Sequence, residues 1–99
     1  MTDSYNAEQI VAQLRQNNLT VATAESLTAG MLSSAIADVS GASTVLHGGI
    51  IAYNNAIKHR LLGVSADTLA ARGAVDAETA KQMARGARER LNADLDRKS

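Results

Sequence analysis

The segment SGASTVLHGGIIAYNNAIKHRLLG, residues 40–63, carries three side chains that could act together in catalysis: Ser43, Tyr53 and Lys58. A serine hydroxyl is a weak nucleophile until a base removes its proton, and a neutral lysine can be that base. A tyrosine hydroxyl between the two can relay the proton or orient the pair. Spacing alone favours a plainer interpretation: a serine in a turn, a tyrosine half-buried in a strand and a lysine on the surface.

The position of Lys58 in a helix bears on its pKa. Asn54 or Asn55 is a suitable N-cap for a helix that ends at Gly63, which places Lys58 in the first turn. The helix dipole is positive there. A positive potential and burial both lower the pKa of a lysine from its ordinary value of about 10.4. A lysine at this position is therefore suited to act as a neutral base.

A second polar motif, TAESLTAG, spans residues 23–30, where a predicted strand leads into a helix. Free backbone N–H groups at such a junction bind anions, Ser26 and Thr28 add hydroxyls, and Gly30 permits close approach. The motif lacks the glycines and the Gly-Lys-Ser/Thr ending of a phosphate loop. An ordinary helix cap also explains it.

Short-chain dehydrogenases also use serine, tyrosine and lysine, but the sequence does not fit that class. Their tyrosine and lysine are four residues apart on one helix face. Here the two are five apart, and no G-x-G-x-x-G motif follows the first predicted strand.

The composition excludes several other classes of function. The 99 residues include 10 basic and 10 acidic ones, and acidic residues flank the basic cluster KQMARGARER, so we expect no nucleic-acid partner. There is no cysteine, and His47 and His59 lie twelve residues apart without an acidic cluster, so we expect no metal or other cofactor. The polar N-terminus and the lack of a long apolar run predict a cytoplasmic protein with no membrane partner.

The hydrophobic pattern predicts an α-β-α-β-α-α-α order. Helices are expected at 7–16, 29–38, about 55–62, 66–72 and 77–92, with Asn6, Ser65 and Asp76 as the caps of the first, fourth and fifth. Extended segments are expected at 19–24 and 43–53, with Gly48-Gly49 as a bulge or a close approach. The fold class is α/β, with a parallel strand pair joined by a right-handed crossover. Two strands are too few for an independent sheet, and residues 93–99 read as a charged tail.

Three motifs, ATAESLTAG, GASTVLHGGIIAYNNAIKHRLLGV and LAARGAVDAETAKQMARGARERLNAD, follow one another between residue 21 and about residue 94. Together they resemble the C-terminal domain of the CinA (competence/damage-inducible) proteins, a family whose stand-alone form, PncC, is a nicotinamide-nucleotide amidase. That family hydrolyses the carboxamide of nicotinamide mononucleotide to nicotinate mononucleotide and ammonia, without a metal. The resemblance implies an αβα layered domain and this small-molecule substrate.

The resemblance also implies a set of site residues. The serine of GAS, the tyrosine of AYNN and the lysine of NAIK correspond to the family's catalytic set, which assigns catalysis to Ser43, Tyr53 and Lys58. The substrate-binding residues expected beside them are Glu25, Ser26, Thr28, Gly30, Gly48, Gly49 and Asn55.

The sequence departs from the family pattern at a few positions. Leu27 and Ala29 replace a cysteine and a glycine of AESCTGG, and Ala42 replaces the first serine of GSS. The family continues with a further strand and a glycine-rich loop, so we expect residues 1–99 to form a single, partial domain that associates as a homo-oligomer. The alternatives are a truncated, non-catalytic assembly or regulatory protein and, ranked lower, a module that binds a partner through its last helix.

Overall fold

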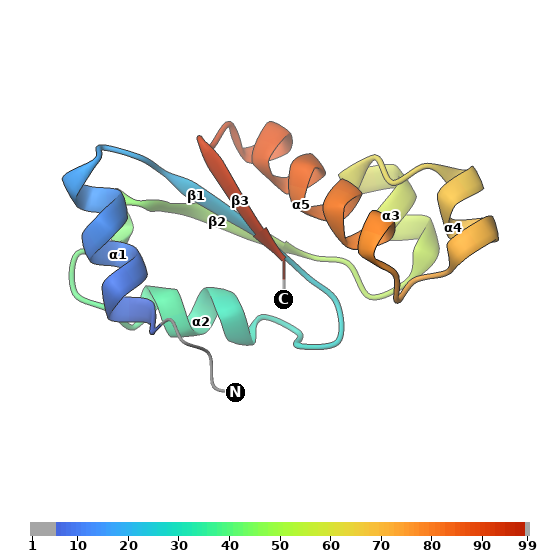
Figure 1. Cartoon of the computed structure of the whole chain (residues 1–99). Helices are drawn as coiled ribbons and strands as arrows, with labels where there is room; N and C mark the ends of the chain where they lie inside the picture. Colours follow the sequence, from blue (N-terminus) through green and yellow to red (C-terminus); the bar gives the residue numbers. More distant parts are fainter. Residues whose placement is uncertain (1–5, 99) are drawn as a thin grey trace.

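A parallel three-stranded sheet lies at the centre of the protein, in a computed structural model that describes residues 6–98 (Figure 1). Its strands are β1 (Val21–Glu25), β2 (Leu46–Ile51) and β3 (Leu95–Lys98), in the order β2-β1-β3. The central strand, β1, is buried along its whole length. The expected α/β class and the parallel pairing of the first two strands are confirmed.

The third strand, β3, corrects the expectation of a strand pair and a charged tail. It runs parallel to β1, in a register from Val21↔Leu95 to Ala24↔Lys98. Just before it, the carboxylate of Asp94 accepts hydrogen bonds from the N–H and the hydroxyl of Thr20, at 2.9 and 3.1 Å. These contacts join residues far apart in the sequence, so no local pattern predicts this strand.

Five α-helices accompany the sheet within residues 6–98, and a 3-10 turn, η1 (Ala42–Thr44), precedes β2. The helices are α1 (Ala7–Gln16), α2 (Met31–Ala37), α3 (Asn55–Leu62), α4 (Ala66–Arg72) and α5 (Ala77–Leu91). Apart from η1 and β3, this is the predicted order. None of the helices in the described part of the chain is long and apolar enough to cross a membrane.

Side-chain caps start several helices as the sequence predicts. Asn6, Ser65 and Asp76 each accept a hydrogen bond from a backbone N–H in the first turn of α1, α4 and α5. For α3 the cap is Asn54, whose side chain accepts from the N–H of Ile57 at 2.9 Å. Asn55 is therefore the first residue of α3 and not its cap.

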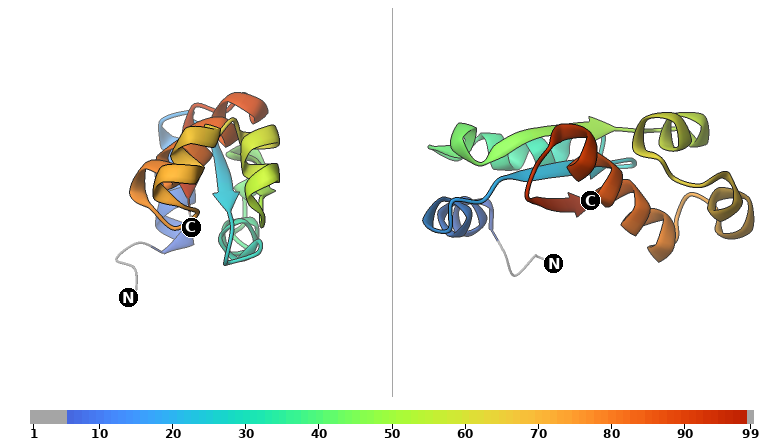
Figure 2. Two further views of the ribbon diagram at one scale, coloured as in Figure 1. Left: turned by 90° about the vertical axis from the view of Figure 1, so that its right-hand side faces the viewer. Right: turned by 90° about the horizontal axis from the view of Figure 1, so that it is seen from above.

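Helices cover both faces of the sheet and give three layers (Figures 1 and 2). On one face, α1 and α2 enclose a core of Val11, Leu14, Val21, Ile36, Ala42 and Val45. On the other face, α5 lies against the sheet and α3 packs on α5, around Ala22, Ala24, Ala52, Leu62, Val64, Met83 and Ala87. Gly86 allows α3 and α5 to meet closely, because a Cβ atom there would overlap the carbonyl group of Leu62.

Candidate active site

The carboxyl ends of the three strands meet at one edge of the sheet, which we call the C-terminal edge. Parallel α/β sheets bind their ligands at this edge. Ser26 follows β1, Tyr53 lies two residues after β2, and Lys98 ends β3. Only residues 52–54 separate β2 from α3, so the first turn of α3 starts at the same edge.

Lys58 is a buried lysine near the start of α3. Its exposed fraction is 1%, and its backbone N–H donates to the carbonyl of the cap, Asn54, at 3.0 Å. Within residues 6–98 its ammonium group has no hydrogen-bond or ion-pair partner. Burial lowers the pKa of Lys58, and the positive charge of Lys98 lowers it further. Lys58 therefore has the physical properties that a lysine base requires.

Tyr53 and Asn55 lie at the same edge as Lys58, with exposed side chains. The N–H of Ala52 donates to the carbonyl of Glu25 at 2.8 Å, which extends the β1–β2 ladder to the residue before Tyr53. The tyrosine is 66% exposed, so its ring projects beyond the end of the sheet. Tyr53 and Lys58 thus belong to one region of the fold.

Ser43 lies at the opposite edge of the sheet. It belongs to η1, which precedes β2, whereas Tyr53 follows β2. The six residues of β2 alone extend about 20 Å, so one chain does not bring Ser43 to its own Lys58. The expected set of three is therefore not assembled within one chain. The separation of Ser43 from Tyr53 and Lys58 could have been predicted from the extended segment expected at 43–53, because the two ends of an extended strand lie far apart.

The surroundings of Ser43 are polar and open. The hydroxyl of Thr44 donates to the carbonyl of Gly41 at 2.8 Å and fixes the η1 turn, while Ser43 is exposed. A cavity of about 340 Å³ lies beside this turn, lined by Leu14, Arg15, Asn18, Leu19, Thr20, Thr44 and Val45. Ser43 is thus accessible at the molecular surface, near this cavity.

Glu25 has a structural role inside the β1–α2 loop. One carboxylate oxygen accepts from the N–H of Leu32 at 2.8 Å and the hydroxyl of Thr28 at 3.0 Å. The other accepts from the N–H and the hydroxyl of Ser33, at 3.0 and 2.5 Å. Burial raises the pKa of this carboxyl, but the hydrogen bonds outweigh burial and hold the pKa below its usual value. Glu25 is 0% exposed and fastens the loop to α2, and the substrate contact expected of it stays a prediction.

Two further positions of the β1–α2 loop, Ala29 and Gly30, have left-handed backbone conformations. Gly30 has φ +102 and starts α2, and a Cβ there would come within 3.2 Å of Ile51. Ala29 also adopts the left-handed conformation, with φ +52. Ser26 faces a cavity and is 8% exposed. The substrate contacts predicted for Ser26, Thr28 and Gly30 stay predictions.

Gly48 and Gly49 lie within β2, where the expected bulge and the expected close approach both occur. The register between β1 and β2 shifts just before Gly48. A Cβ on Gly49 would overlap the hydroxyl of Thr23 and approach that of Ser33 to 2.5 Å. These two hydroxyls are themselves 2.6 Å apart. Close packing therefore explains why glycine occupies these positions. The contact of Gly48 and Gly49 with a substrate stays a prediction.

A cavity of about 390 Å³ opens at the C-terminal edge, between the β1–α2 loop, the end of β3 and the start of α5. Its lining residues are Ser26, Leu27, Ala74, Val75, Asp76, Ala77, Ala80 and Lys98. The volume falls within the range of about 300–1,000 Å³ typical of small-molecule sites. The serine hydroxyl and the lysine ammonium give it polar groups next to exposed apolar ones.

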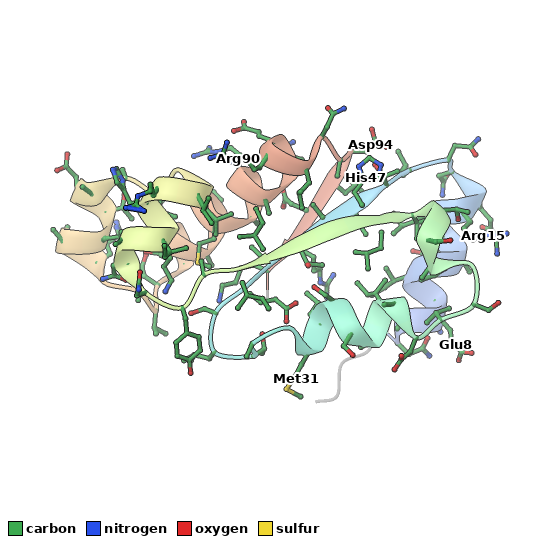
Figure 3. The ribbon with its side chains drawn as sticks, turned by 180° about the vertical axis from the view of Figure 1, so that it is seen from behind. Glu8, Arg15, Met31, His47, Arg90 and Asp94 are labelled. Carbon is green, nitrogen blue, oxygen red and sulfur yellow. The ribbon has the colours of Figure 1, made fainter. Side chains whose placement is uncertain are left out.

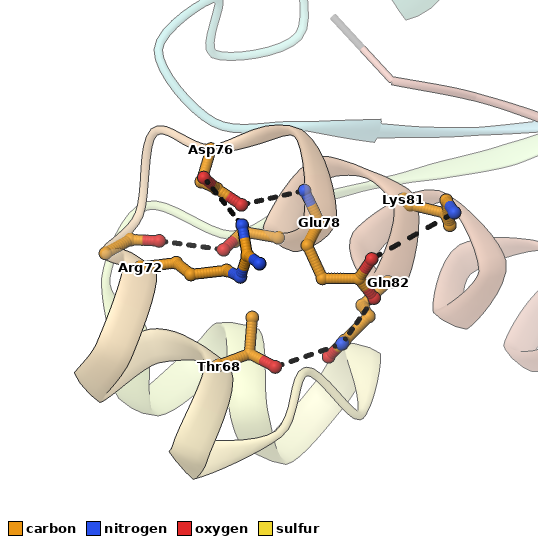
Figure 4. Close-up of polar contacts among 8 residues, drawn as sticks. Thr68, Arg72, Asp76, Glu78, Lys81 and Gln82 are labelled. Atoms are coloured by element: carbon orange, nitrogen blue, oxygen red, sulfur yellow. Dashed lines mark hydrogen bonds and ion pairs between the residues drawn. The ribbon is translucent and has the colours of Figure 1, made fainter.

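A polar network holds the α4–α5 loop that forms one wall of this cavity (Figure 4). Asp76 accepts from the N–H of Glu78 at 2.8 Å and lies 3.6 Å from the guanidinium of Arg72. The side-chain amide of Gln82 donates to Thr68 at 3.1 Å and to Glu78 at 2.9 Å. The wall is therefore fixed by bonds between α4 and α5.

Sequence reasoning missed two contributors to this edge. Lys98 lies in a segment that resembled a tail, and only its pairing with β1 brings it to the cavity. Asp76 was expected solely as a helix cap, and its place on the cavity wall follows from the packing of α5. Neither position has a local signal in the sequence.

The two histidines bond to backbone carbonyl groups. The Nδ1 atom of His47 lies 3.0 Å from the carbonyl oxygen of Leu91, and that of His59 lies 2.7 Å from the carbonyl oxygen of Val64. Among residues 6–98 there is no group of three or more histidine, aspartate or glutamate side chains arranged to hold a metal ion.

The sequence matches the family described as the CinA C-terminal domain over residues 3–96. This chain belongs to that family. It is 47% identical over 94 residues to a protein of Thermoanaerobacter sp. (strain X514) described as competence-damage inducible. It is 43% identical over 95 residues to a CinA-like protein of Thermotoga neapolitana. The match covers 94% and 96% of this chain but 23% of each relative, so the chain spans about a quarter of their length.

Solved structures of CinA proteins share the fold. A CinA superfamily protein from Escherichia coli matches with a TM-score of 0.87 and 32% identity, over 89% of this chain and 51% of that one. A competence/damage inducible protein from Agrobacterium tumefaciens matches with a TM-score of 0.82 and 37% identity, over 90% and 53%. The three-layer arrangement with a parallel sheet is therefore the CinA fold, of which this chain spans about half in those structures.

Proposed function

We propose that this CinA-family chain takes part in hydrolysing the carboxamide of nicotinamide mononucleotide to nicotinate mononucleotide and ammonia. The observation that carries the proposal is Lys58, a lysine 1% exposed and without a partner in the described chain. Proteins seldom bury a lysine side chain, because the desolvation of its charged form is costly. A lysine whose pKa is lowered at the ligand-binding edge of a sheet is a candidate base.

The chemistry follows from a neutral Lys58. Ser26, at the end of β1, is the serine that lies at the same edge as Tyr53 and Lys58. Its hydroxyl attacks the carboxamide carbon while its proton passes, with Tyr53 as relay, to the lysine nitrogen. The lysine then gives this proton to the departing nitrogen, the C–N bond breaks and ammonia leaves. Water then attacks the resulting ester with the same lysine as base. The serine oxygen leaves and takes the proton from the lysine, which restores the serine hydroxyl and forms the carboxylate of the product.

The cavity at the C-terminal edge supports the choice of a nucleotide. Its volume of about 390 Å³ suits part of a mononucleotide. Lys98 on its wall offers a positive charge to a phosphate group. Burial lowers the pKa of Lys58, and the same positive charge lowers it further.

The test is ammonia release from nicotinamide mononucleotide by the purified protein and by Lys58→Met. Methionine keeps the length of the side chain and removes the base, so we expect the rate to fall by about 10²–10⁴-fold. The control is Lys81→Met on α5, where the side chain is 72% exposed and the rate should not change. Activity that survives Lys58→Met would refute the assigned base.

A second candidate function is a non-catalytic assembly or regulatory protein. It is favoured by the exposed apolar residues at the C-terminal edge, where Met31 is 71% and Ile51 is 51% exposed. A protein that self-associates but neither binds nor hydrolyses the nucleotide would support this candidate over the amidase.

A further inference from the structure

Glu25 is a buried carboxylate that directly precedes Ser26, the serine to which the proposed reaction assigns the attack. Successive side chains of a strand point to opposite faces of the sheet. Ala22 and Ala24 belong to the core beneath α5, whereas Glu25 bonds to α2 on the other face. Ser26 therefore emerges on the α5 face, where it lines the cavity at the C-terminal edge. The carboxylate and the serine thus lie back to back at the end of β1.

The carboxylate of Glu25 holds the β1–α2 loop, residues 26–30, at several points. Its Oε1 atom accepts from the hydroxyl of Thr28, in the middle of the loop, at 3.0 Å, and from the N–H of Leu32, just beyond it, at 2.8 Å. Its Oε2 atom accepts from the N–H and the hydroxyl of Ser33, at 3.0 and 2.5 Å. One side chain thus fixes the loop where it begins, halfway along it and where α2 starts.

Ser26 is part of the turn that these bonds hold in place. Its carbonyl accepts from the N–H of Ala29 at 3.2 Å, and the carbonyl of Thr28 accepts from the N–H of Met31 at 3.1 Å. Ala29 has a left-handed backbone, which is unfavourable for a residue with a side chain. A strained turn persists where its surroundings determine it. A loop released from Glu25 would therefore relax and carry Ser26 with it.

A second hydroxyl connects this network to the centre of the sheet. Ser33 donates its hydroxyl proton to Glu25, so it accepts from the hydroxyl of Thr23 on β1, 2.6 Å away. Gly49 on β2 leaves room for the pair, because a Cβ atom there would overlap both hydroxyls. In Figure 3 Met31, the first residue of α2, points away from the sheet, which leaves the other side of the first turn to face it. The network is thus enclosed between two strands and a helix.

These bonds require a carboxylate and not an amide. An ionised carboxylate only accepts hydrogen bonds, whereas the amide of a glutamine has one accepting oxygen and one donating NH2 group. Each oxygen of Glu25 receives an N–H and a hydroxyl. In either orientation a glutamine would therefore turn its NH2 group toward one pair of donors. The same hydrogen bonds hold the pKa of Glu25 below its usual value, although burial raises it, so the side chain is ionised at neutral pH.

We propose that Glu25 is a positioning residue, which holds Ser26 where its hydroxyl can attack the substrate. The inference rests on the proposed amidase function, and it gives Glu25 a part in that reaction without contact with the nucleotide. A displacement of about 1 Å in a reacting group can cost about 10²-fold in rate. Loosening the loop should therefore slow the chemical step more than it weakens binding, since the phosphate is assigned to Lys98 on β3.

The experiment compares the kinetics of the wild type with those of Glu25→Gln and Ser33→Ala. We expect kcat for ammonia release to fall about 10²-fold in Glu25→Gln and by a smaller factor in Ser33→Ala, while KM for nicotinamide mononucleotide changes less than about twofold. The control is Val11→Ala, which loosens the core beneath α1 and should leave the kcat of folded chains unchanged. Circular dichroism gives the folded fraction at the assay temperature. Ser33→Ala decides the question if Glu25→Gln does not fold.

A second measurement follows Ser26 without the nucleotide. The oxygen of a reactive serine displaces fluoride from a fluorophosphonate probe, and mass spectrometry of the peptide that contains Ser26 gives the rate of labelling. We expect Glu25→Gln and Ser33→Ala to be labelled more slowly than the wild type, in the same order as their kcat values. Ser26→Ala provides the unlabelled reference.

Unchanged kcat and unchanged labelling in both variants would overturn the inference. A raised KM with an unchanged kcat would also overturn it, because Glu25 would then act in binding the substrate. A wild type that is labelled at Ser26 but releases no ammonia refutes the proposed function alone, and the labelling rates then decide the role of Glu25. A wild type that shows neither reaction refutes Ser26 as the nucleophile and this inference with it.

Discussion

At the scale of single residues, the protein tolerates unfavourable placements at its C-terminal edge. Lys58 is buried without a partner, and Ala29 adopts a left-handed backbone that favours glycine. Strain and desolvation of this kind persist where function requires them. Both positions can therefore be tested by substitutions that should stabilise the fold.

Lys58→Met should raise the free energy of unfolding at neutral pH by on the order of 1 kcal/mol, because it removes a buried charge. Burial and the charge of Lys98 lower the pKa of Lys58 in the folded state. The unfolded chain thus binds this proton more tightly. Stability in the wild type should rise with pH between the folded pKa and the ordinary value of about 10.4, and this rise should be absent in the variant.

Urea unfolding at several values between pH 7 and pH 10.5 measures this difference. Lys81→Met is the control, because its side chain is 72% exposed and it should follow the wild-type curve. Identical pH dependences for the wild type and Lys58→Met would show that Lys58 is not an unpaired buried cation.

Ala29→Gly should stabilise the protein by about 0.5–1 kcal/mol. An L-residue in the left-handed region costs about 1–2 kcal/mol, and the greater freedom of glycine in the unfolded chain offsets about half of the gain. Thermal unfolding checks the prediction against Ala71→Gly, an exposed position within α4, which should lose about 1 kcal/mol. A destabilised Ala29→Gly would mean that the residue at this position makes favourable contacts that glycine lacks.

At the scale of elements, two helix contacts place the site. α3 carries Lys58 and is positioned by α5, whose own start is fixed by the network around Asp76 and Gln82. On the opposite face, Glu25 fastens the β1–α2 loop to the first turn of α2. The β1–α2 loop and the α4–α5 loop are thus each bonded to a helix. These two loops form fixed walls of the cavity.

Gly86→Ala should destabilise the fold by about 1–3 kcal/mol or more. Alanine is the better helix former, but its Cβ would overlap the carbonyl group of Leu62, and a backbone group cannot rotate away. α3 would have to move off α5, carrying Lys58 with it. Chemical denaturation measures the change, and Glu89→Ala, on the exposed side of α5, serves as the reference. An unchanged or increased stability of Gly86→Ala would contradict the close contact of the two helices.

At the scale of the whole molecule, the sheet has a protected centre and an unprotected edge. β1 is buried between two neighbours, while β2 has one neighbour in the described chain and no charge along it. An edge strand without charges is open to pairing with a further strand, so the homo-oligomer stays a prediction that this edge favours.

Much of the local structure was predictable from the sequence because local interactions cause it. The caps Asn6, Ser65 and Asp76 bond to N–H groups two or three residues away, and the apolar spacing of each segment selects a helix or a strand. The place of Lys58 near the start of a helix, five residues after Tyr53, follows from the same signals. The motifs also indicated the CinA family, which the match over residues 3–96 confirms.

Only the tertiary structure decided how these parts meet. β3 exists because Thr20 and Asp94, 74 residues apart, bring a polar segment beside β1. Glu25 turned inward because Leu32 and Ser33 present N–H groups to it once α2 is packed. The separation of Ser43 from Lys58 follows from the direction of β2 in the sheet. Sequence by itself determined which residues can do chemistry, whereas long-range packing, which no local pattern encodes, decided which of them can do it together.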